Sequence, residues 1–248
     1  MSPWNRQSSA AVQSQQTATA VDAGLRSYML KVYNLMASGV LLTGIIAYFA
    51  GTSEAFLNAV ISQGANGQYG LNGLGWLIAL APIAMVFFIG FRARHMSPGA
   101  LQMAFWTYAA LFGLALFSIF LVYTGESIIK VFFVTAGTFG ILSIYGYTTK
   151  RDLTSWGTFL FVGIWAVFLT TLANVFLFKS SGLDLALSYV GVLLALGLTA
   201  YDTQKVKEIY YTTSGEGLAK ASTLGALSLY FDFIYLFVNL MRIMGERR

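Results

Sequence analysis

Seven long apolar runs dominate the chain and constrain its fold more than any other feature. An apolar stretch of about 20 residues is the length that crosses a bilayer as a helix. The runs occupy residues 28–50, 74–91, 100–123, 128–147, 153–178, 185–201 and 224–241. About a quarter of the residues of a soluble domain are charged, whereas 10% of this chain is charged and 57% is hydrophobic. We therefore expect an all-α polytopic membrane protein, a bundle of seven transmembrane helices in a lipid bilayer.

The first 24 residues differ from the rest in composition. They are rich in Ser, Gln and Ala and carry only two charges, Arg6 and Asp22. Such a composition is typical of disordered segments. We expect a disordered cytoplasmic tail over residues 1–24 and a transmembrane domain over residues 25–248.

Basic residues follow the second, fourth and sixth runs, whereas the Gly- and Asn-rich linker of residues 51–73 has none. Lys and Arg collect on the cytoplasmic side of a membrane protein, so this alternation predicts a cytoplasmic N-terminus. Residues 203–223 form the longest predicted cytoplasmic loop, and residues 204–211 could continue the sixth helix. Three arginines after the last run oppose the rule. Either the last helix crosses fully, or it turns back and the C-terminus stays inside.

The chain lacks the residues that several classes of protein require. The chain has no cysteine, and its one histidine, His95, lies in a charged loop, so thiolate and histidine metal sites are excluded. Hydrolase, phosphate-loop and dinucleotide motifs are absent. The basic residues are scattered between apolar runs rather than gathered in a nucleic-acid-binding patch. We expect no enzymatic activity, no cofactor and no nucleic-acid partner.

Asp232 lies in the middle of the last run and is the only charged residue between positions 221 and 241. An ionised carboxylate facing lipid costs about 3 kcal/mol or more. It must therefore face the interior of the bundle, bind a proton or have a partner. A polar stripe spaced by four and three residues shares its helix face: Ser228, Asp232, Tyr235, Asn239 and Arg242. The stripe predicts a central last helix, with these side chains lining a path or, alternatively, joining helices by hydrogen bonds.

Other polar residues are further candidates for the interior site. Asp202 ends the sixth run, where it is either an interfacial carboxylate near Lys205 or, on a short helix, a buried one. Two carboxylates in a poorly solvated site cannot both ionise easily and take up protons as a unit. Asn174 in the fifth run is expected to face inward. Arg92 and Arg94 end the second run, where each could anchor the helix or pair with an aspartate.

Residues 227–242, which read LSLYFDFIYLFVNLMR, closely resemble the C-terminal signature of the transmembrane Bax inhibitor motif family in its bacterial branch. Shorter pieces at residues 30–36, 150–153 and 201–204 occur in the order that this family shows. The resemblance covers nearly the whole chain after the tail. It implies a seven-helix bundle whose last helix is enclosed by the other six, in a bacterial inner membrane.

The resemblance also implies a function. Bacterial members are regarded as pH-sensitive calcium leak channels gated by two aspartates, which match Asp202 and Asp232 here. These carboxylates would be transient ligands of the calcium ion, and the arginine that latches onto them aligns best with Arg92, although Arg94 is close by.

Other members resemble modulators of the membrane protease FtsH, and eukaryotic relatives suppress cell death. The alternative is therefore a regulator without transport, either of an FtsH-type protease, contacted through residues 1–24, or of a stress response. A proton-coupled solute exporter is a third interpretation, which the lack of a clear inverted repeat disfavours.

Overall fold

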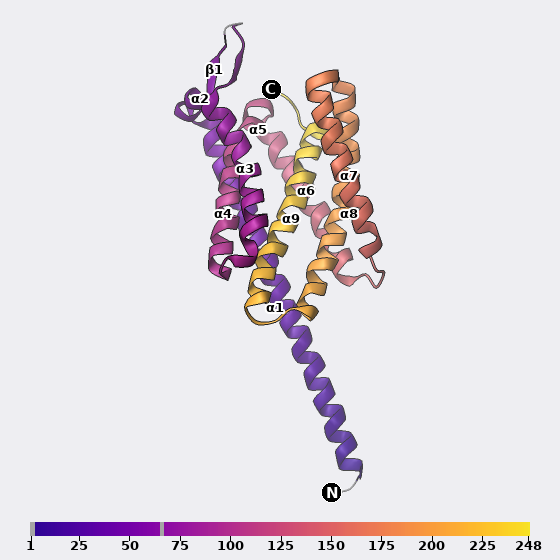
Figure 1. Cartoon of the computed structure of the whole chain (residues 1–248). Helices are drawn as coiled ribbons and strands as arrows, with labels where there is room; N and C mark the ends of the chain where they lie inside the picture. The colour runs from indigo at the N-terminus through magenta and orange to yellow at the C-terminus, as the bar shows by residue number, and fades with distance from the viewer. Residues whose placement is uncertain (1–2, 65–66) are drawn as a thin grey trace.

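The structure is a computed structural model that describes the backbone of residues 3–64 and 67–248 and the side chains of residues 21–64 and 67–248. Seven stretches of helix in this part of the chain are long and apolar enough to cross a membrane. The helices that form them are α1 (Pro3–Thr52), α3 (Gly73–Arg92), α4 (Pro98–Ala115) with α5 (Phe117–Val122), α6 (Gly125–Thr148), α7 (Thr154–Ala173), α8 (Ser181–Thr212) and α9 (Gly215–Met244) (Figure 1). The predicted all-α, seven-span architecture is confirmed.

Short polar residues start most of these helices. The side chains of four N-cap residues accept a hydrogen bond from a backbone N–H of the first helical turn: Asn72, Ser97, Thr124 and Ser180. Each bond satisfies a donor that the helix itself leaves free. Pro98 follows one of these caps at the first helical position, where its missing N–H costs nothing. The helix starts are therefore encoded locally, next to the apolar runs.

The backbone of α1 continues past residue 24 without a break, and its N-terminal part projects from the bundle (Figure 1). The structure does not describe the side chains of residues 1–20, which make up most of the predicted tail of residues 1–24. The predicted division between this tail and a domain of residues 25–248 is therefore not tested. That division stays a prediction.

The linker between the first two spans contains structure that its composition does not reveal. A short helix, α2 (Glu54–Val60), leads into an antiparallel hairpin of β1 (Ile61–Gln63) and β2 (Tyr69–Leu71). The Asn72 side chain ties the hairpin to the helices on both sides, because its Nδ2 donates to the Ala59 carbonyl at 2.8 Å and its Oδ1 accepts from Gly75. The linker is thus a folded cap on one end of the bundle (Figure 1).

The prediction of a long loop over residues 203–223 is wrong, because the connection is much shorter. The helix α8 continues to Thr212 and α9 begins at Gly215, which leaves only residues 213 and 214 between them. The continuation predicted over residues 204–211 is confirmed. Apolarity marks where the chain leaves the lipid, whereas the backbone hydrogen bonds of a helix continue into the polar region. Gly215 has a φ of 59°, which permits so short a turn.

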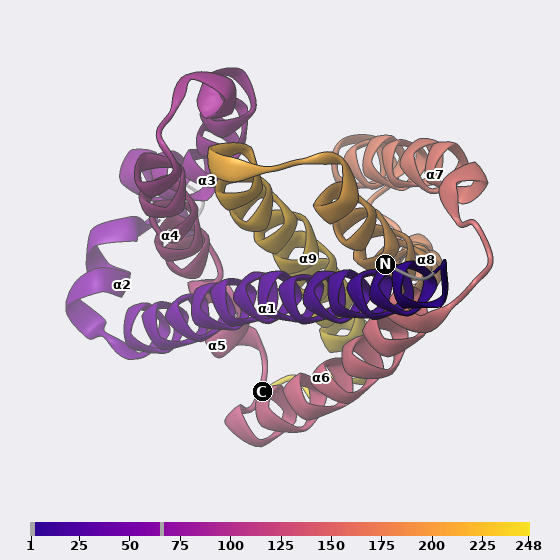
Figure 2. The ribbon, with the colours of Figure 1, turned by 90° about the horizontal axis from the view of Figure 1, so that it is seen from below.

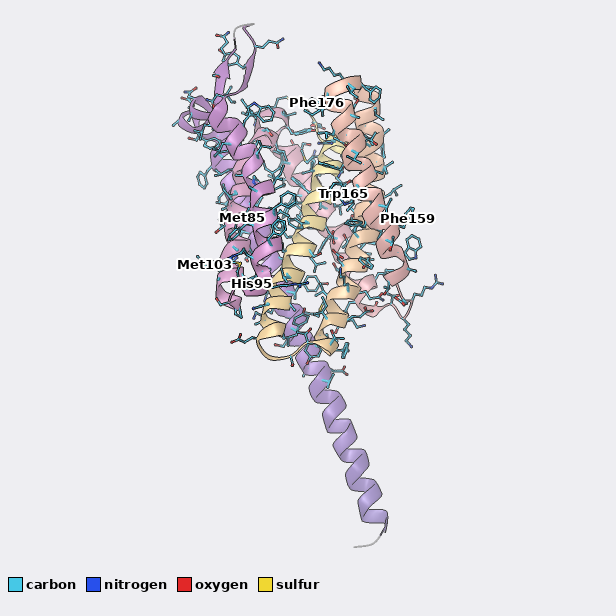
Figure 3. The ribbon with its side chains drawn as sticks, viewed as in Figure 1. Met85, His95, Met103, Phe159, Trp165 and Phe176 are labelled. Atoms are coloured by element: carbon cyan, nitrogen blue, oxygen red, sulfur yellow. The ribbon has the colours of Figure 1, made fainter. Side chains whose placement is uncertain are left out.

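The last helix is central, as predicted. In α9, 67% of the most apolar 18-residue window is buried, against 17–39% in the other six spans. It packs mainly against α1, α4, α6 and α8, while α3 packs against α4 and α7 packs against α8 in an outer layer (Figure 2). The outer faces of the two helices carry exposed apolar side chains, such as Phe87 and Phe91 on α3 and Phe159 and Trp165 on α7 (Figure 3). Two layers of helix therefore separate α9 from lipid on these two sides.

The C-terminus lies at the end of the bundle opposite the α8–α9 turn (Figure 1). The tail pairs with the junction of α5 and α6: the N–H of Arg248 donates to Val122 at 2.9 Å, and Thr124 donates to the Glu246 carbonyl at 3.0 Å. Tyr123 and Arg247 form an antiparallel bridge. Of the two alternatives left by the sequence, the last helix crosses the bundle fully.

Candidate functional site

The two predicted carboxylates lie together between α8 and α9. Asp202 and Asp232 are 9% and 5% exposed. Ser228, one turn before Asp232 on α9, donates its hydroxyl hydrogen to Asp202 Oδ2 across the helix interface. Asp232 lies four residues after Ser228, on the same face of α9, and therefore also faces Asp202. The structure therefore brings three of the predicted site residues into one buried cluster.

Among the residues that the structure describes, no cationic side chain pairs with this cluster. Oδ2 of Asp232 is buried and has no hydrogen-bond partner in the described part of the chain. No Lys, Arg or His nitrogen of the described residues lies within 4.0 Å of either carboxylate. Lys205, whose charge acts on Asp202, is itself exposed and lies 5.7 Å from the centre of the Tyr201 ring. Two buried carboxylates without a cation are costly when both are charged, so this arrangement suits a pair that holds at least one proton.

The rest of the polar stripe continues along the same face of α9. Asn239 is buried and donates its Nδ2 to the Tyr235 carbonyl at 2.7 Å. It packs on Gly191 of α8, where an added Cβ would lie 2.5 Å from Asn239 Oδ1. At the end of the stripe, Arg242 Nη1 lies 3.5 Å from Asp184 Oδ1 of α8. Ser228, Asn239 and Arg242 of the predicted stripe therefore contact α8, and we call this contact the α8–α9 seam.

Two predicted residues lie away from the carboxylates. Arg92 and Arg94 are exposed at and just after the end of α3, and neither forms an ion pair within the described residues. The carbonyl of Arg94 accepts a hydrogen bond from Lys220 Nζ at 3.2 Å, which joins this connection to the start of α9. The predicted latch of Arg92 on the aspartates is not formed in this arrangement and stays a prediction for another state.

Asn174 is buried, at the point where α7 passes into a π-helical turn, η2 (Asn174–Phe178). Its Oδ1 accepts from the N–H of Ser180 and its Nδ2 donates to the Ser180 carbonyl, both at 3.0 Å. Lys179 between them adopts a left-handed conformation with φ 50°. In this structure the amide thus closes the α7–α8 turn, and the assignment of Asn174 to a path stays a prediction.

Gln204 is a structural contact that sequence reasoning missed. Its Oε1 accepts from the N–H of Leu153 and its Nε2 donates to the Arg151 carbonyl, both at 2.8 Å. One turn further, Lys207 Nζ donates to the Tyr147 carbonyl at 2.8 Å. These bonds fix α8, immediately after Asp202, to the α6–α7 turn. One sequence signal could have indicated this contact: residues 150–153 and residues 201–204 both resemble short segments of the family. The hydrogen bonds between the two segments explain why both occur.

Comparison with known proteins gives a consistent result. The family model described as "Inhibitor of apoptosis-promoting Bax1" matches residues 25–248. Inner membrane protein YbhL of Escherichia coli K12 is 45% identical over 229 residues, which cover 91% of this chain and 94% of YbhL. The protein RP147 of Rickettsia prowazekii is 43% identical over 230 residues, 92% of each chain. A protein of Caulobacter vibrioides is 39% identical over 250 residues and is covered completely.

Proposed function

The chain belongs to the Bax inhibitor family of membrane proteins, and we propose that it is a pH-sensitive cation leak channel, with calcium as the permeant ion. Asp202 and Asp232 form the proton-sensitive gate of this channel. The observation that carries the proposal is the burial of both carboxylates at one interface, beside Ser228 and without a cation in the described residues.

The gate works through the protonation of the pair. With a proton bound, the carboxyl groups tolerate burial and α8 stays packed on α9. When both groups ionise, two like charges meet in a medium of low dielectric and repel each other strongly. The repulsion opens the α8–α9 seam, and water and cations enter along its polar side chains. Carboxylate and hydroxyl oxygens are ligands that Ca²⁺ accepts, and water completes the coordination of a passing ion.

We infer the membrane and the orientation from the relatives and the charge pattern. The name of YbhL places that protein in the inner membrane, and we place this chain there as well. The connections at residues 93–97, 149–153 and 213–214 lie at one end of the bundle (Figure 1). The basic residues that follow the second, fourth and sixth runs lie at this end, which we assign to the cytoplasm. The N-terminus is then cytoplasmic and the C-terminus lies on the other side.

Calcium flux into liposomes that carry the purified protein, measured from pH 5 to pH 8, tests the gate. The flux of the wild type should rise with pH, because loss of the shared proton opens the seam. The variant Asp232→Asn keeps the shape of the side chain but cannot ionise, so its flux should not respond to pH. An unchanged pH profile in this variant would remove Asp232 from the gate.

A matched control is Asp152→Asn. The carboxylate of Asp152 is exposed and accepts hydrogen bonds from the hydroxyl and the N–H of Thr154, which hold its pKa below the usual range. It stays ionised from pH 5 to pH 8, so its removal should leave the pH profile unchanged. A wild-type flux that rises as pH falls would support the Arg92 latch, because protonation of the pair would then release the arginine.

A regulator of an FtsH-type membrane protease is the second candidate. The projection of the N-terminal part of α1 from the bundle favours it, because this part is accessible to a partner (Figure 1). Deletion of residues 1–24 should then abolish co-purification with the protease and leave calcium flux intact. Equal recovery of the protease with and without these residues would reject this candidate.

A further inference from the structure

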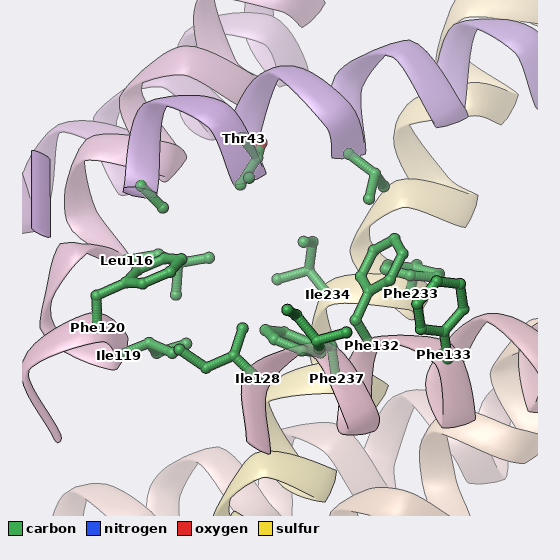
Figure 4. Close-up of a pocket in the computed structure, with 14 residues that line it drawn as sticks. Thr43, Leu116, Ile119, Phe120, Ile128, Phe132, Phe133, Phe233, Ile234 and Phe237 are labelled. Atoms are coloured by element: carbon green, nitrogen blue, oxygen red, sulfur yellow. The ribbon is translucent and has the colours of Figure 1, made fainter. Parts of the chain in front are cut away.

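An apolar crevice lies on the side of α9 opposite the α8–α9 seam. Its floor consists of Phe233, Ile234 and Phe237, which lie roughly 100° to 160° around the helix from Asp232. A cavity of about 210 Å³ lies above this floor, between α1, α5 and α6 (Figure 4). A second cavity of about 330 Å³ adjoins it and shares Val40, Phe132 and Phe233. The two cavities together form one groove, which we call the α1–α6 crevice.

The first cavity offers nothing to hold water. Of the described residues that line it, Thr43 alone has a polar side chain. The Thr43 hydroxyl is already bonded to the Ala109 carbonyl at 2.8 Å and to the Tyr230 hydroxyl at 2.7 Å, both away from the cavity. Apolar cavities of about 150 Å³ in other proteins stay dry and take up apolar guests. The chemistry of this cavity therefore selects hydrocarbon.

The crevice is open toward the bilayer. Ile129 and Phe133 form its rim on α6 and are 59% and 68% exposed. On the opposite rim, Gly44 of α1 has no atom within 4 Å of the position where a Cβ would be. Exposed apolar groups within a membrane span contact lipid chains, so an acyl chain reaches the crevice without crossing a polar barrier.

The length of the crevice matches one leaflet. Along α6 it extends from Ile128 to Phe139, a distance of about 17 Å at 1.5 Å per residue. Because α6 runs from Gly125 to Thr148, the crevice begins near the end of the helix beside the C-terminus and stops at its middle. The hydrocarbon of one leaflet is about 15 Å thick, half of the bilayer core.

Basic groups lie at the outer end of the crevice. Lys130 follows the rim residue Ile129, is exposed and pairs with Glu126 at 2.7 Å. The N–H of Thr124, just before α6, donates to the Glu246 carbonyl at 3.0 Å, so the tail with Arg247 and Arg248 lies nearby. Cations at this depth favour the phosphate of a lipid headgroup.

We propose that the α1–α6 crevice binds one acyl chain of a phospholipid from the leaflet at the C-terminal end of the bundle, with the phosphate near Lys130. The bound chain lies on Phe233 and Ile234, which follow Asp232 directly in α9. Occupancy therefore acts on the helix that carries Asp232, from the side opposite to the α8–α9 seam.

Photolabelling tests the site without any measurement of transport. The full-length protein is reconstituted in liposomes of phosphatidylethanolamine and a phosphatidylglycerol with a diazirine in one acyl chain, irradiated and mapped by peptide mass spectrometry. Labels should concentrate on residues 40–47 and 128–133. The variant Gly44→Leu fills the cavity and should lower this labelling at least about fivefold, equivalent to roughly 1 kcal/mol. Gly90→Leu, at an exposed glycine of α3 with equally open space, should leave it unchanged.

A second variant removes a wall instead of filling the space. Phe133→Ala deletes an exposed rim side chain, so the fold is retained, and labelling of residues 40–47 should fall; Phe91→Ala on α3, which is 79% exposed, is its control. Labels spread evenly over the outer faces of α3 and α7 and unaffected by Gly44→Leu would overturn the proposal. So would displacement of the labels by a free fatty acid but not by unlabelled phosphatidylglycerol.

Discussion

The two faces of α9 meet their surroundings in opposite ways. The face with Asp232 and Asn239 contacts α8 through polar side chains. On this face the Ser228 hydroxyl donates a hydrogen bond across the interface to Asp202. The face with Phe233 and Phe237 contacts α1, α5 and α6 mainly by apolar packing, with one hydrogen bond between Tyr230 and Thr43 of α1, and it leaves open volume between the helices. One helix therefore has a specific face and a permissive face.

The difference arises because lipid chains can replace apolar protein contacts but not polar ones. A polar group inside a membrane needs a protein or water partner, so the polar face determines which helix lies beside it. Lipid chains are as apolar as Leu or Phe, so an apolar face gains little by preferring protein to lipid. Imperfect packing is costly on the first face and cheap on the second. We accordingly assign the proton-sensitive gate to the first face and a lipid site to the second.

Enlarging Gly191 should have the largest effect on stability. In the variant Gly191→Leu the new side chain meets Asn239 in the α8–α9 seam, and overpacking of a closed interface costs about 3 kcal/mol. Gly182→Leu, on the same helix with its nearest neighbour at 3.9 Å, should cost far less. Unfolding in detergent micelles by titrated denaturant measures both. Equal losses would show that the seam is no more tightly packed than the rest of α8.

Removing the Thr43 hydroxyl should have an intermediate effect. Thr43→Val keeps the shape of the crevice wall but leaves the Ala109 carbonyl and the Tyr230 hydroxyl without their partner. Hydrogen bonds between transmembrane helices contribute about 0.6 kcal/mol each, so we expect a loss of about 1 kcal/mol. Thr170→Val, whose hydroxyl bonds only within α7, is the control for the same unfolding measurement. Weaker lipid labelling in Thr43→Val would contradict our inference that this hydroxyl bonds within the bundle and does not contact the lipid in the crevice.

Neutralising Asp184 should have the smallest effect. Its ion pair with Arg242 spans 3.5 Å, with side chains 41% and 37% exposed, and exposed pairs contribute about 0.5 kcal/mol or less. Asp184→Asn should therefore shift unfolding only slightly, and the shift should vanish at high ionic strength. A loss as large as that of Gly191→Leu would mean that the specific character of the seam extends to its polar end.

Most of the fold could be predicted because lipid imposes a length on every span. The seven runs correspond to the seven observed spans, and the polar stripe around Asp232 identified α9 as central. The hairpin of β1 and β2 was not predicted, because residues 51–73 show no apolar periodicity. The extension of α8 beyond Asp202 exceeds its apolar run, because backbone hydrogen bonds do not end where hydrocarbon ends.

The candidate site was predictable where one helix carries the signal. The side chains of Ser228 and Asp232 share a face by their spacing. Asp202 was a candidate from its place at the end of the sixth run, and the resemblance to the family paired it with Asp232. The contact of Gln204 with Arg151 joins α8 to a turn 53 residues earlier in the chain, and no local pattern encodes it. The α1–α6 crevice is a space between helices that their side chains do not fill. It could not be predicted from the sequence, because it depends on how the helices pack.

The central position of α9 has a consequence for the biosynthesis of the chain. Chains emerge from the ribosome N-terminus first, so the helix that fills the middle of the bundle is the last to be made. Until then the outer helices surround a vacant centre, and Asp202 on α8 has no neighbour on α9. The two-residue turn before Gly215 lets α8 and α9 enter the membrane as one hairpin, which delivers both carboxylates together. A nascent chain stopped before residue 215 would be an open ring of helices, a substrate for quality control rather than a smaller version of the protein.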